Sequence, residues 1–397
     1  MSIYLKSNKR TDEGKKKDVK NIRLHGREIV FGTGSLEYIN EFKYKRYFIV
    51  TGKSAMFKNG TINKIKKILD DKECEYTIFA GIGGNPTTDE VLRGTTEMVS
   101  FQPDVVVGVG GGSAIDACKV MLLLYENPHL NFNNINQGIM ELKRKTALVA
   151  IPSTSGTGTE VTKTAVVTFK ENNIKIGLKT YAFIPDIAIL DGELTLSMPK
   201  EIVAYTGMDA MTHAVECYIN NKLDDFSEVL CRGAVEGLYK YLPISYEKGD
   251  IKSRQKVHNY QCMAGTAFHN VGLGMDHGIS HAFGGMFDYG HGLLNAVGLP
   301  YVLQYNSKDD TVKKKLDKLT KAIGETDFIE GIKKLNSDLS IPASFMEMGI
   351  SEEEFINNYE VLLDNSMLGS TRSNPITMSR EEMDKVLKSI FYGKILF

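Results

Sequence analysis

The stretch VVVGVGGGSAIDACKVMLLL occupies residues 105–124. It begins with a β-branched run, Val105–Val107, that is typical of a buried strand, and it ends in an apolar segment, 114–124, that suits a buried helix. A glycine turn between a strand and a helix presents backbone N–H groups and a helix N-terminus to a phosphate. Three adjacent glycines, Gly110–Gly112, are conformationally costly unless the backbone needs positive φ or close approach. We therefore predict a phosphate-binding loop, with an ordinary tight turn as the alternative.

The segments around this stretch repeat the order of strand and helix. Between the predicted strands, the isoleucines of 62–68 fall on one helical face, and Thr87 with Glu90 forms a capping box for another helix. Two later β-like stretches, 164–168 and 184–190, complete this half of the chain. Alternating strands and helices predict a parallel sheet with helices on both faces. The buried strands are predicted at 47–50, 77–79, 105–107 and 147–151.

The chain changes character near residue 190. After Asp191 the β-rich runs largely stop, and the pattern is mostly helical as far as Phe397. We predict a flexible lysine-rich tail at 1–20, an α/β domain at 21–190 and an all-helical domain at 191–397. A cleft between two such domains is a common ligand site.

The composition is that of an ordinary globular protein. Among 397 residues, 48 Lys and Arg balance 49 Asp and Glu, for a formal charge of −1. Nucleic-acid-binding domains are usually basic, so this charge gives no indication of nucleic-acid binding. The sequence has no run of about 18 apolar residues, so we expect no membrane span. Five cysteines with no C-x-x-C pair indicate reduced thiols and a cytoplasmic protein. We also expect a homodimer or a higher homo-oligomer, because dimers are frequent among soluble enzymes.

A second loop rich in small polar residues follows the predicted strand at 147–151. It reads PSTSGTGTE over residues 152–160. Its hydroxyls and glycines supply donors with little bulk, which suits a ribose, a pyrophosphate or a carboxamide; the alternative is an ordinary hydroxyl-rich turn. A third segment, Gly52-Lys53-Ser54, resembles the end of a Walker A loop, but Tyr47 stands where the leading glycine must be. We therefore exclude an ATPase of that type.

Four of the eight histidines can be joined by one geometric argument. Asp209 and His213 lie four residues apart in a predicted helix, so both side chains point from one face toward a common ion. His277 and His281 repeat this interval, and His291 follows in a glycine-rich stretch. A mixed set of Asp and His suits Fe(II) or Zn(II) rather than calcium. Taken singly, each histidine fits a hydrogen-bonded buried imidazole, but as a group they indicate a metal site.

These motifs resemble those of the iron-containing (group III) alcohol dehydrogenase family. The resemblance runs from about Asn21 to the C-terminus, in the family's order and spacing. It implies a two-domain, dehydroquinate-synthase-like fold with a Rossmann-like dinucleotide-binding domain and a helical domain that carries the metal and the catalytic groups. It also implies hydride transfer between a primary alcohol or an aldehyde and a nicotinamide cofactor. The matching motifs are GGGSAIDACK at 110–119, the segment 152–162, GMDAMTHAVE at 207–216, HGISH at 277–281 and GHG at 290–292.

The resemblance implies a role for each matching position. The family's metal ligands fall on Asp209, His213, His277 and His291. His281 matches a histidine near the nicotinamide that assists proton movement. The family's cofactor positions fall on Asn85, Gly111, Gly112, Ser113, Ser153, Thr154, Thr157, Thr162, Val166 and Lys175.

One departure from the family bears on the choice of cofactor. The position after the strand at 47–50 often holds an acid that binds the adenosine ribose 2′-OH and repels a 2′-phosphate. Here it is Gly52, and Lys53 and Ser54 follow with room and hydrogen-bond donors. The sequence therefore predicts a preference for NADP(H), with NAD(H) as the second choice. This would be a reductase of the NADPH-dependent butanol or short-chain aldehyde type.

Other readings remain at this point. A dehydroquinate-synthase-like lyase would share the fold and use NAD without net oxidation, but the set of one Asp and three His argues against it. A zinc glycerol dehydrogenase fits the glycine-loop and histidine patterns less well. A metal-binding scaffold without turnover is the non-enzyme alternative, and the motifs show no missing catalytic group.

Overall fold

A computed structural model describes residues 22–135, 138–169 and 174–397. Its central feature is a sheet of six parallel strands in the order β1-β8-β5-β4-β2-β3. The four predicted strands are confirmed, and the expected segment 184–190 contributes its second half. The edge strand β1 lies outside the predicted set. The strands are β1 (Glu28–Phe31), β2 (Arg46–Gly52), β3 (Glu75–Ile82), β4 (Val105–Gly110), β5 (Ala147–Pro152) and β8 (Ile187–Leu190).

Helices cover both faces of this sheet, as predicted. On one face α2 (Thr61–Asp71) packs its isoleucines, with Ile62 among them, into a cluster that includes Ile49. On the other face, α3 (Thr88–Phe101) and α4 (Gly112–Glu126) share a cluster with Phe48. Neighbouring strand residues such as Phe48 and Ile49 face opposite sides, because side chains alternate along a strand. The short helix α1 (Ala55–Lys58) follows β2, and Thr87 with Glu90 forms the predicted capping box of α3.

A separate two-stranded ribbon corrects one expectation. The β-like stretch at 164–168 does not join the parallel sheet; it is β6 (Thr164–Phe169) and pairs antiparallel with β7 (Ile174–Lys179), which the sequence pattern did not reveal. Side chains of α4 hold the ribbon in place. Asp116 accepts a hydrogen bond from the Val166 backbone at 2.9 Å, and the Lys119 ammonium donates to the Thr164 carbonyl at 2.9 Å.

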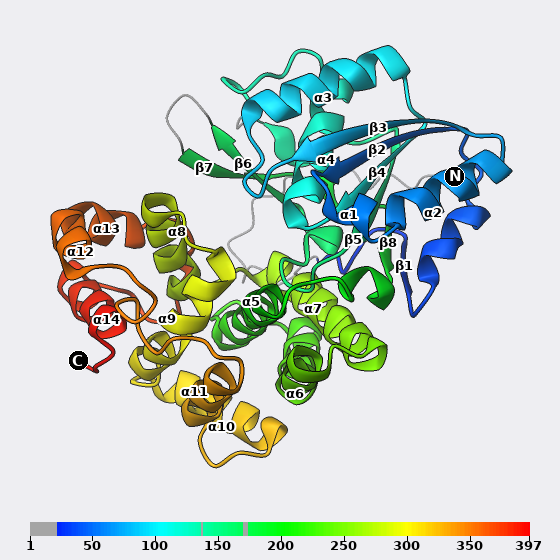
Figure 1. Cartoon of the computed structure of the whole chain (residues 1–397). Helices are drawn as coiled ribbons and strands as arrows, with labels where there is room; N and C mark the ends of the chain where they lie inside the picture. The colour runs from blue at the N-terminus through cyan, green and yellow to red at the C-terminus, as the bar shows by residue number, and fades with distance from the viewer. Residues whose placement is uncertain (1–21, 136–137, 170–173) are drawn as a thin grey trace, which may run out of the picture.

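The second half of the chain is helical, as predicted. The long helix α5 lies at its centre, and it packs against α6, α7 and α9 (Figure 1). Pro199 stands at its N-cap, one position before the first turn. No helix in the described part of the chain is both long and apolar enough to cross a membrane. The helices are α5 (Lys200–Ile219), α6 (Asp225–Lys248), α7 (Ile251–Val271), α8 (Met275–Phe287), α9 (His291–Asn306), α10 (Asp310–Ile323), α11 (Phe328–Asp338), α12 (Glu352–Asn357), α13 (Tyr359–Ser366) and α14 (Arg380–Tyr392).

The order of the strands places a ligand site at one edge of the sheet. From β2 the chain passes to β3 on one side, whereas β4, β5 and β8 extend the sheet on the other side. The two directions therefore part between β2 and β4, where Gly52 and Gly110 end their strands. Ligands of open α/β sheets bind outside the carboxyl ends of the strands at such a point.

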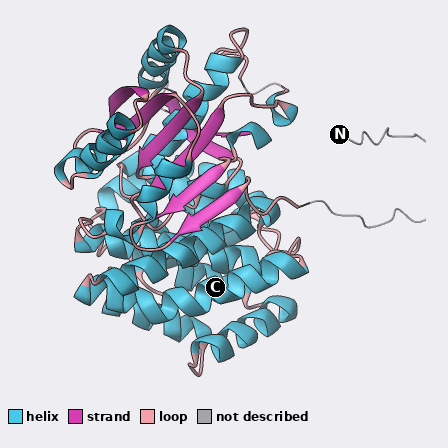
Figure 2. Cartoon of the chain, turned by 90° about the vertical axis from the view of Figure 1, so that its right-hand side faces the viewer, coloured by secondary structure: helices cyan, strands magenta, loops and turns pink. Residues whose placement is uncertain are grey.

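Figure 2 shows the sheet and the ribbon above the layer of helices. The predicted tail at 1–20 lies outside the described residues.

Candidate active site

The glycine loop, Gly110–Ser113, lies at the carboxyl edge of the sheet, between β4 and α4. Gly110 has φ 142°, a conformation that favours glycine. A Cβ on Gly112 would lie 2.8 Å from the Thr157 side chain, so the glycine lets the two loops touch. Gly111 is the N-cap of α4, and no side chain caps that helix. The first turn of α4 therefore presents backbone N–H groups, the donors that an anion binds.

The other loops predicted to bind the cofactor gather around this turn. The Ser153 backbone donates to the Gly110 carbonyl at 2.9 Å, and the Ser113 hydroxyl donates to the Gly84 carbonyl. The Asn85 amide, next in the chain, donates to Asp288 at the end of α8 at 3.4 Å. These contacts bring three loops, 83–85, 110–113 and 152–157, to one place.

The remaining predicted cofactor residues flank this place. The Gly52 nitrogen lies 3.9 Å from the position that a Cβ on Gly110 would take, and the next two residues, Lys53 and Ser54, are exposed. Thr154 packs beside Gly111, 3.6 Å from its would-be Cβ. The remaining three come from the ribbon and the chain that leads into it: Val166 and Lys175, which are exposed, and Thr162, which is buried.

Side chains of helix α7 form hydrogen bonds with the hydroxyl-rich loop at 152–160. The His258 imidazole and the Ser155 hydroxyl form a buried hydrogen bond of 2.9 Å. The Gln261 amide donates to Glu160 at 2.6 Å and accepts from the Gly158 backbone at 3.1 Å. A Cβ on Gly158 would lie 2.6 Å from the backbone of α7, so glycine is needed for this close approach. The loop is therefore held on a rigid helix.

The predicted metal ligands meet on the far side of that loop. Asp209 and His213 project from α5, His277 from α8 and His291 from the first residue of α9. Ligand atoms of Asp209, His213 and His277 all lie within 4.8 Å of one another. The Asp209 carboxylate lies 3.9 Å from His213 Nδ1, 3.8 Å from His277 Nε2 and 3.7 Å from His291 Nε2.

The state of these nitrogens suits a bound cation. The buried Nδ1 of His213 has no hydrogen-bond partner in the described structure. His277 donates from Nδ1 to Glu216, which leaves a lone pair on Nε2. The amide nitrogen of Asn295 lies 3.3 Å from His277 Nε2 and 3.2 Å from His291 Nε2, so an N–H donor faces these two lone pairs, whereas that of His213 Nδ1 has none. A borderline divalent ion such as Fe(II) or Zn(II) accepts this donor set.

Electrostatics keeps the cluster in the protonation state that a metal requires. Burial lowers the pKa of His213, His277 and His291 below the usual imidazole value, so their lone pairs are free at neutral pH. Burial also raises the pKa of Asp209, but the neighbouring imidazoles and a hydrogen bond from Asn295 outweigh it, and the net shift is downward. The carboxylate therefore stays ionised.

Two residues that were not predicted support the ligands. Asn295 donates to Asp209 at 2.8 Å, and Glu216 accepts from His277 Nδ1 at 2.7 Å. Helical spacing could have identified both. Glu216 follows Asp209 and His213 in an i, i+4, i+7 pattern, and Asn295 lies four residues after His291.

His281 lies where the cluster meets solvent. Its ring stacks on His291 with centroids 4.8 Å apart and meets His277 edge to face at 6.3 Å. The His281 side chain is exposed, although surrounding protein lowers its pKa well below the usual value, with smaller contributions from the other histidines and from Lys175. The charge of Lys175 in the ribbon also lowers the pKa of His291, after the larger effect of burial.

The glycine loop and the histidine cluster belong to one site. Thr157 touches Gly112, and the backbone of Gly156, the preceding residue, lies near the His213 ring. Phe268 of α7 stacks on that ring, with centroids 4.3 Å apart. The segment 156–157 therefore lies between the glycine turn and the imidazole of His213.

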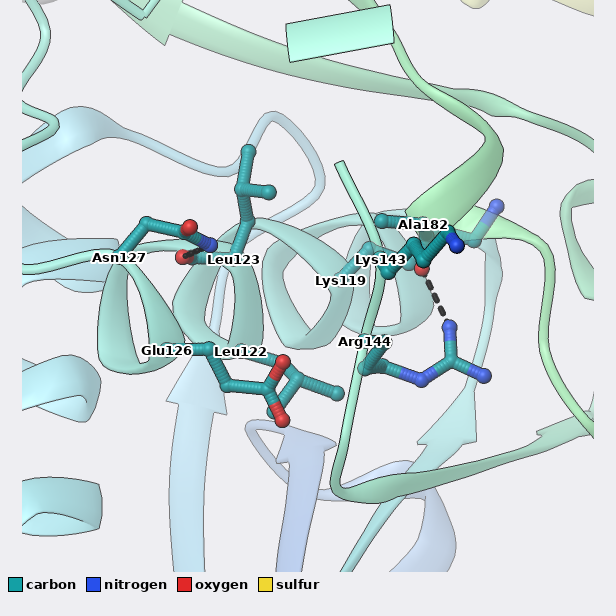
Figure 3. Close-up of a pocket in the computed structure, with 8 residues that line it drawn as sticks. All are labelled: Lys119, Leu122, Leu123, Glu126, Asn127, Lys143, Arg144 and Ala182. Atoms are coloured by element: carbon teal, nitrogen blue, oxygen red, sulfur yellow. Dashed lines mark hydrogen bonds between the residues drawn. The ribbon is translucent and has the colours of Figure 1, made fainter. Parts of the chain in front are cut away.

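A small pocket at the opposite end of α4 is separate from this site (Figure 3). It is lined by residues that include Glu126, Lys143 and Arg144. The guanidinium of Arg144 donates to the carbonyls of Thr146 and Ala182 and to the carboxylate of Asp186. These N–H groups of Arg144 therefore bond to the protein itself and stabilise the fold.

Comparisons with known proteins agree with this arrangement. A family model for iron-containing alcohol dehydrogenases matches residues 26–192, and a second, for the C-terminal region of the Fe-containing family, matches residues 203–391. An NADPH-dependent butanol dehydrogenase of Clostridium saccharobutylicum is 37% identical over 377 residues, which cover 92% of this chain and 97% of that protein.

Solved structures agree as well. An iron-containing alcohol dehydrogenase from Thermococcus thioreducens superposes with a TM-score of 0.87 at 31% identity, over 93% of this chain and 99% of the other. A 1,3-propanediol oxidoreductase gives a TM-score of 0.86 at 27% identity, over 92% and 98% of the two chains.

Proposed function

Because this chain belongs to the family of iron-containing alcohol dehydrogenases, we propose that Asp209, His213, His277 and His291 bind the one divalent ion of its active site. The enzyme is an oxidoreductase that interconverts alcohols and aldehydes with a nicotinamide cofactor. The observation that carries the ligand assignment is the convergence of three imidazoles on one buried carboxylate.

Different residues of the chain bind the cofactor and the ion. When bound, the ion supplies Lewis-acid polarisation of the substrate oxygen and the nicotinamide supplies the hydride chemistry. The backbone N–H groups at Gly112 and Ser113 hold the pyrophosphate, and the hydroxyl-rich loop at 153–157 orients the rest of the cofactor. Phe268 stacks on the ring of His213 and shields it from water.

We propose a short primary alcohol, or the matching aldehyde, as substrate. The relatives whose names specify butanol, 1-propanol and 1,3-propanediol support this class. The test is a panel of aldehydes with NADPH and anaerobically iron-loaded enzyme, in which loss of the reduced-nicotinamide absorbance reports turnover. Turnover of short aldehydes supports the proposal, whereas product formation without net cofactor oxidation would favour a lyase instead.

We propose that NADP(H) is the preferred cofactor. Gly52 lies beside the glycine loop with no carboxylate, and exposed Lys53 and Ser54 can donate to a 2′-phosphate. The wild-type enzyme should show a higher kcat/KM with NADPH than with NADH; the opposite order would refute this. Gly52→Asp should lower the NADPH/NADH ratio of kcat/KM by about 10- to 100-fold, since juxtaposed like charges cost several kcal/mol. Lys53→Ala should weaken NADPH use more than NADH use.

We propose that His281 passes the substrate proton to solvent. It lies one helical turn from His277, touches His291 and reaches solvent. A neutral imidazole has one nitrogen that accepts a proton and one that donates. His281→Ala should lower kcat by about 10²-fold and remove one limb of the pH–rate profile, as expected for loss of a general acid–base group. If the variant keeps both the rate and the profile, His281 only positions its neighbours.

We infer three further properties of the chain. A dinucleotide-binding domain at 21–190 and a metal-binding domain at 191–397 agree with the two family models, which meet near this boundary. A cytoplasmic location is supported by the five cysteines, all of them free and buried. A homodimer or higher homo-oligomer is supported by the edge strand β1, where Phe31 is 65% exposed. Light scattering of the purified protein tests the last of these.

A further inference from the structure

Glu216 connects the metal cluster to the start of α8. Its carboxylate is buried and projects from α5, seven residues after Asp209. It accepts three N–H groups: from the Gly274 backbone at 2.9 Å, from the Asp276 backbone at 2.7 Å and from the His277 ring at 2.7 Å. Each donor belongs to α8 or to its N-cap.

The surroundings of Glu216 are shaped for this contact. Gly274 is the N-cap of α8 and offers no side chain of its own to cap the helix. A Cβ at Gly274 would lie 2.7 Å from Glu216 Oε1, so glycine is needed for the carboxylate to approach. Glu216 thus takes over the role of the capping side chain, since the first N–H groups of a helix have no intrahelical partner.

The contact with His277 also determines what that ring presents to the cluster. A neutral imidazole carries one proton, and a carboxylate accepts but does not donate. The hydrogen bond to Glu216 therefore keeps the proton on Nδ1, and the lone pair lies on Nε2, 3.8 Å from Asp209. With the other tautomer, an N–H would face the position of the ion.

We propose that Glu216 is a positioning residue of the metal site, which fixes both the orientation and the tautomer of His277 while it caps α8. This rests on the proposed ligand set. Partners of this kind on metal-bound histidines typically change metal affinity by about 10- to 100-fold.

The test compares two buried carboxylates that cap backbone N–H groups. Glu216→Gln keeps the size of the side chain but places an amide N–H₂ among the three donors. The matched control is Asp191→Asn, because Asp191 is buried, accepts from the backbones of Gly34 and Leu36 at 3.0 Å, and bonds no histidine in the described part of the chain. For each protein we would measure the Kd for Zn²⁺ by competition with a chromogenic chelator, the absorption spectrum with Co²⁺, and the Tm without metal.

Both variants should lower the Tm of the metal-free protein. Only Glu216→Gln should raise the Kd for Zn²⁺, by about 10- to 100-fold, and change the Co²⁺ spectrum. A wild-type Kd and spectrum in Glu216→Gln, together with a lower Tm, would overturn the proposal and leave Glu216 as a helix cap alone. If wild-type protein shows no saturable site that His277→Ala removes, the ligand assignment itself fails instead.

A second measurement decides the question if Glu216→Gln does not fold. In metal-free wild-type protein labelled with ¹⁵N-histidine, the His277 resonances at neutral pH should show a neutral ring with the proton on Nδ1 and the lone pair on Nε2. Protonation of Nε2 would overturn the proposal.

Discussion

Replacing His277 with alanine is expected to give a folded protein that has lost its metal and its turnover. His277 is buried and supplies one of the imidazole nitrogens that face Asp209, at 3.8 Å. A three-ligand remainder holds a borderline divalent ion far less tightly, and the lost Lewis acid contributes several kcal/mol to the transition state. We expect kcat to fall by about 10³-fold or more, since each 1.4 kcal/mol is about tenfold in rate. Elemental analysis of anaerobically purified protein and steady-state kinetics measure the two effects.

A control histidine separates this effect from general damage to the fold. His269 of α7 is also buried, and its ring bonds the Arg23 carbonyl, away from the cluster. His269→Ala should lose thermal stability and keep one metal per chain. Stoichiometric metal in His277→Ala would contradict the ligand assignment.

A single methyl group at Gly292 is expected to disrupt the same site from outside the ligand set. Gly292 follows His291 in the first turn of α9. A Cβ there would lie 2.2 Å from the Tyr205 carbonyl oxygen and 3.2 Å from Asp209 Cβ, both in α5. The backbone of α5 cannot yield as a flexible side chain would, so α9 must move and carry His291 away from Asp209.

Gly292→Ala should therefore lower the Tm and raise the Kd for Zn²⁺ by at least about tenfold, as overpacking typically costs 1–3 kcal/mol. Gly290→Ala is the matched control, because Gly290 has φ −60° and nothing within 4 Å of its would-be Cβ. Titration with Zn²⁺ and thermal unfolding of both variants measure these effects. Wild-type metal affinity in Gly292→Ala would show that the contact between α5 and α9 does not set the position of His291.

The parallel sheet was predictable because most of its strands are short runs of apolar residues that can be recognised in the sequence. Val105–Val107 and the segment 47–50 are buried, and such segments form continuous apolar runs in the sequence. β1 and the ribbon strand β7 were not predicted. β1 is a four-residue edge strand with the short apolar run Ile29–Phe31, and its residues are half-buried or exposed. β7 alternates apolar residues with lysine and glycine and pairs with β6 alone, outside the main sheet. Both patterns are shorter or less apolar than those of the central strands β4 and β5.

Part of the candidate site could be predicted from residue spacing, and part depends on tertiary packing. Asp209 and His213 share a helix, so their spacing alone indicated a common face. That α8 and α9 bring His277 and His291 to that face depends on tertiary packing, and here the resemblance to a known family supplied what spacing could not. Glu216 was within reach of the spacing argument, but its carboxylate became meaningful only when α8 was seen to begin against it.

The most direct test of the ligand set is an anomalous-difference map from crystals of anaerobically iron-loaded enzyme, collected at the iron absorption edge with a bound nicotinamide. We expect one peak per chain, within bonding distance of Asp209, His213 Nδ1, His277 Nε2 and His291 Nε2, on the side that faces the cofactor. Iron bound elsewhere, or no peak among these four side chains at saturating iron, would contradict the account.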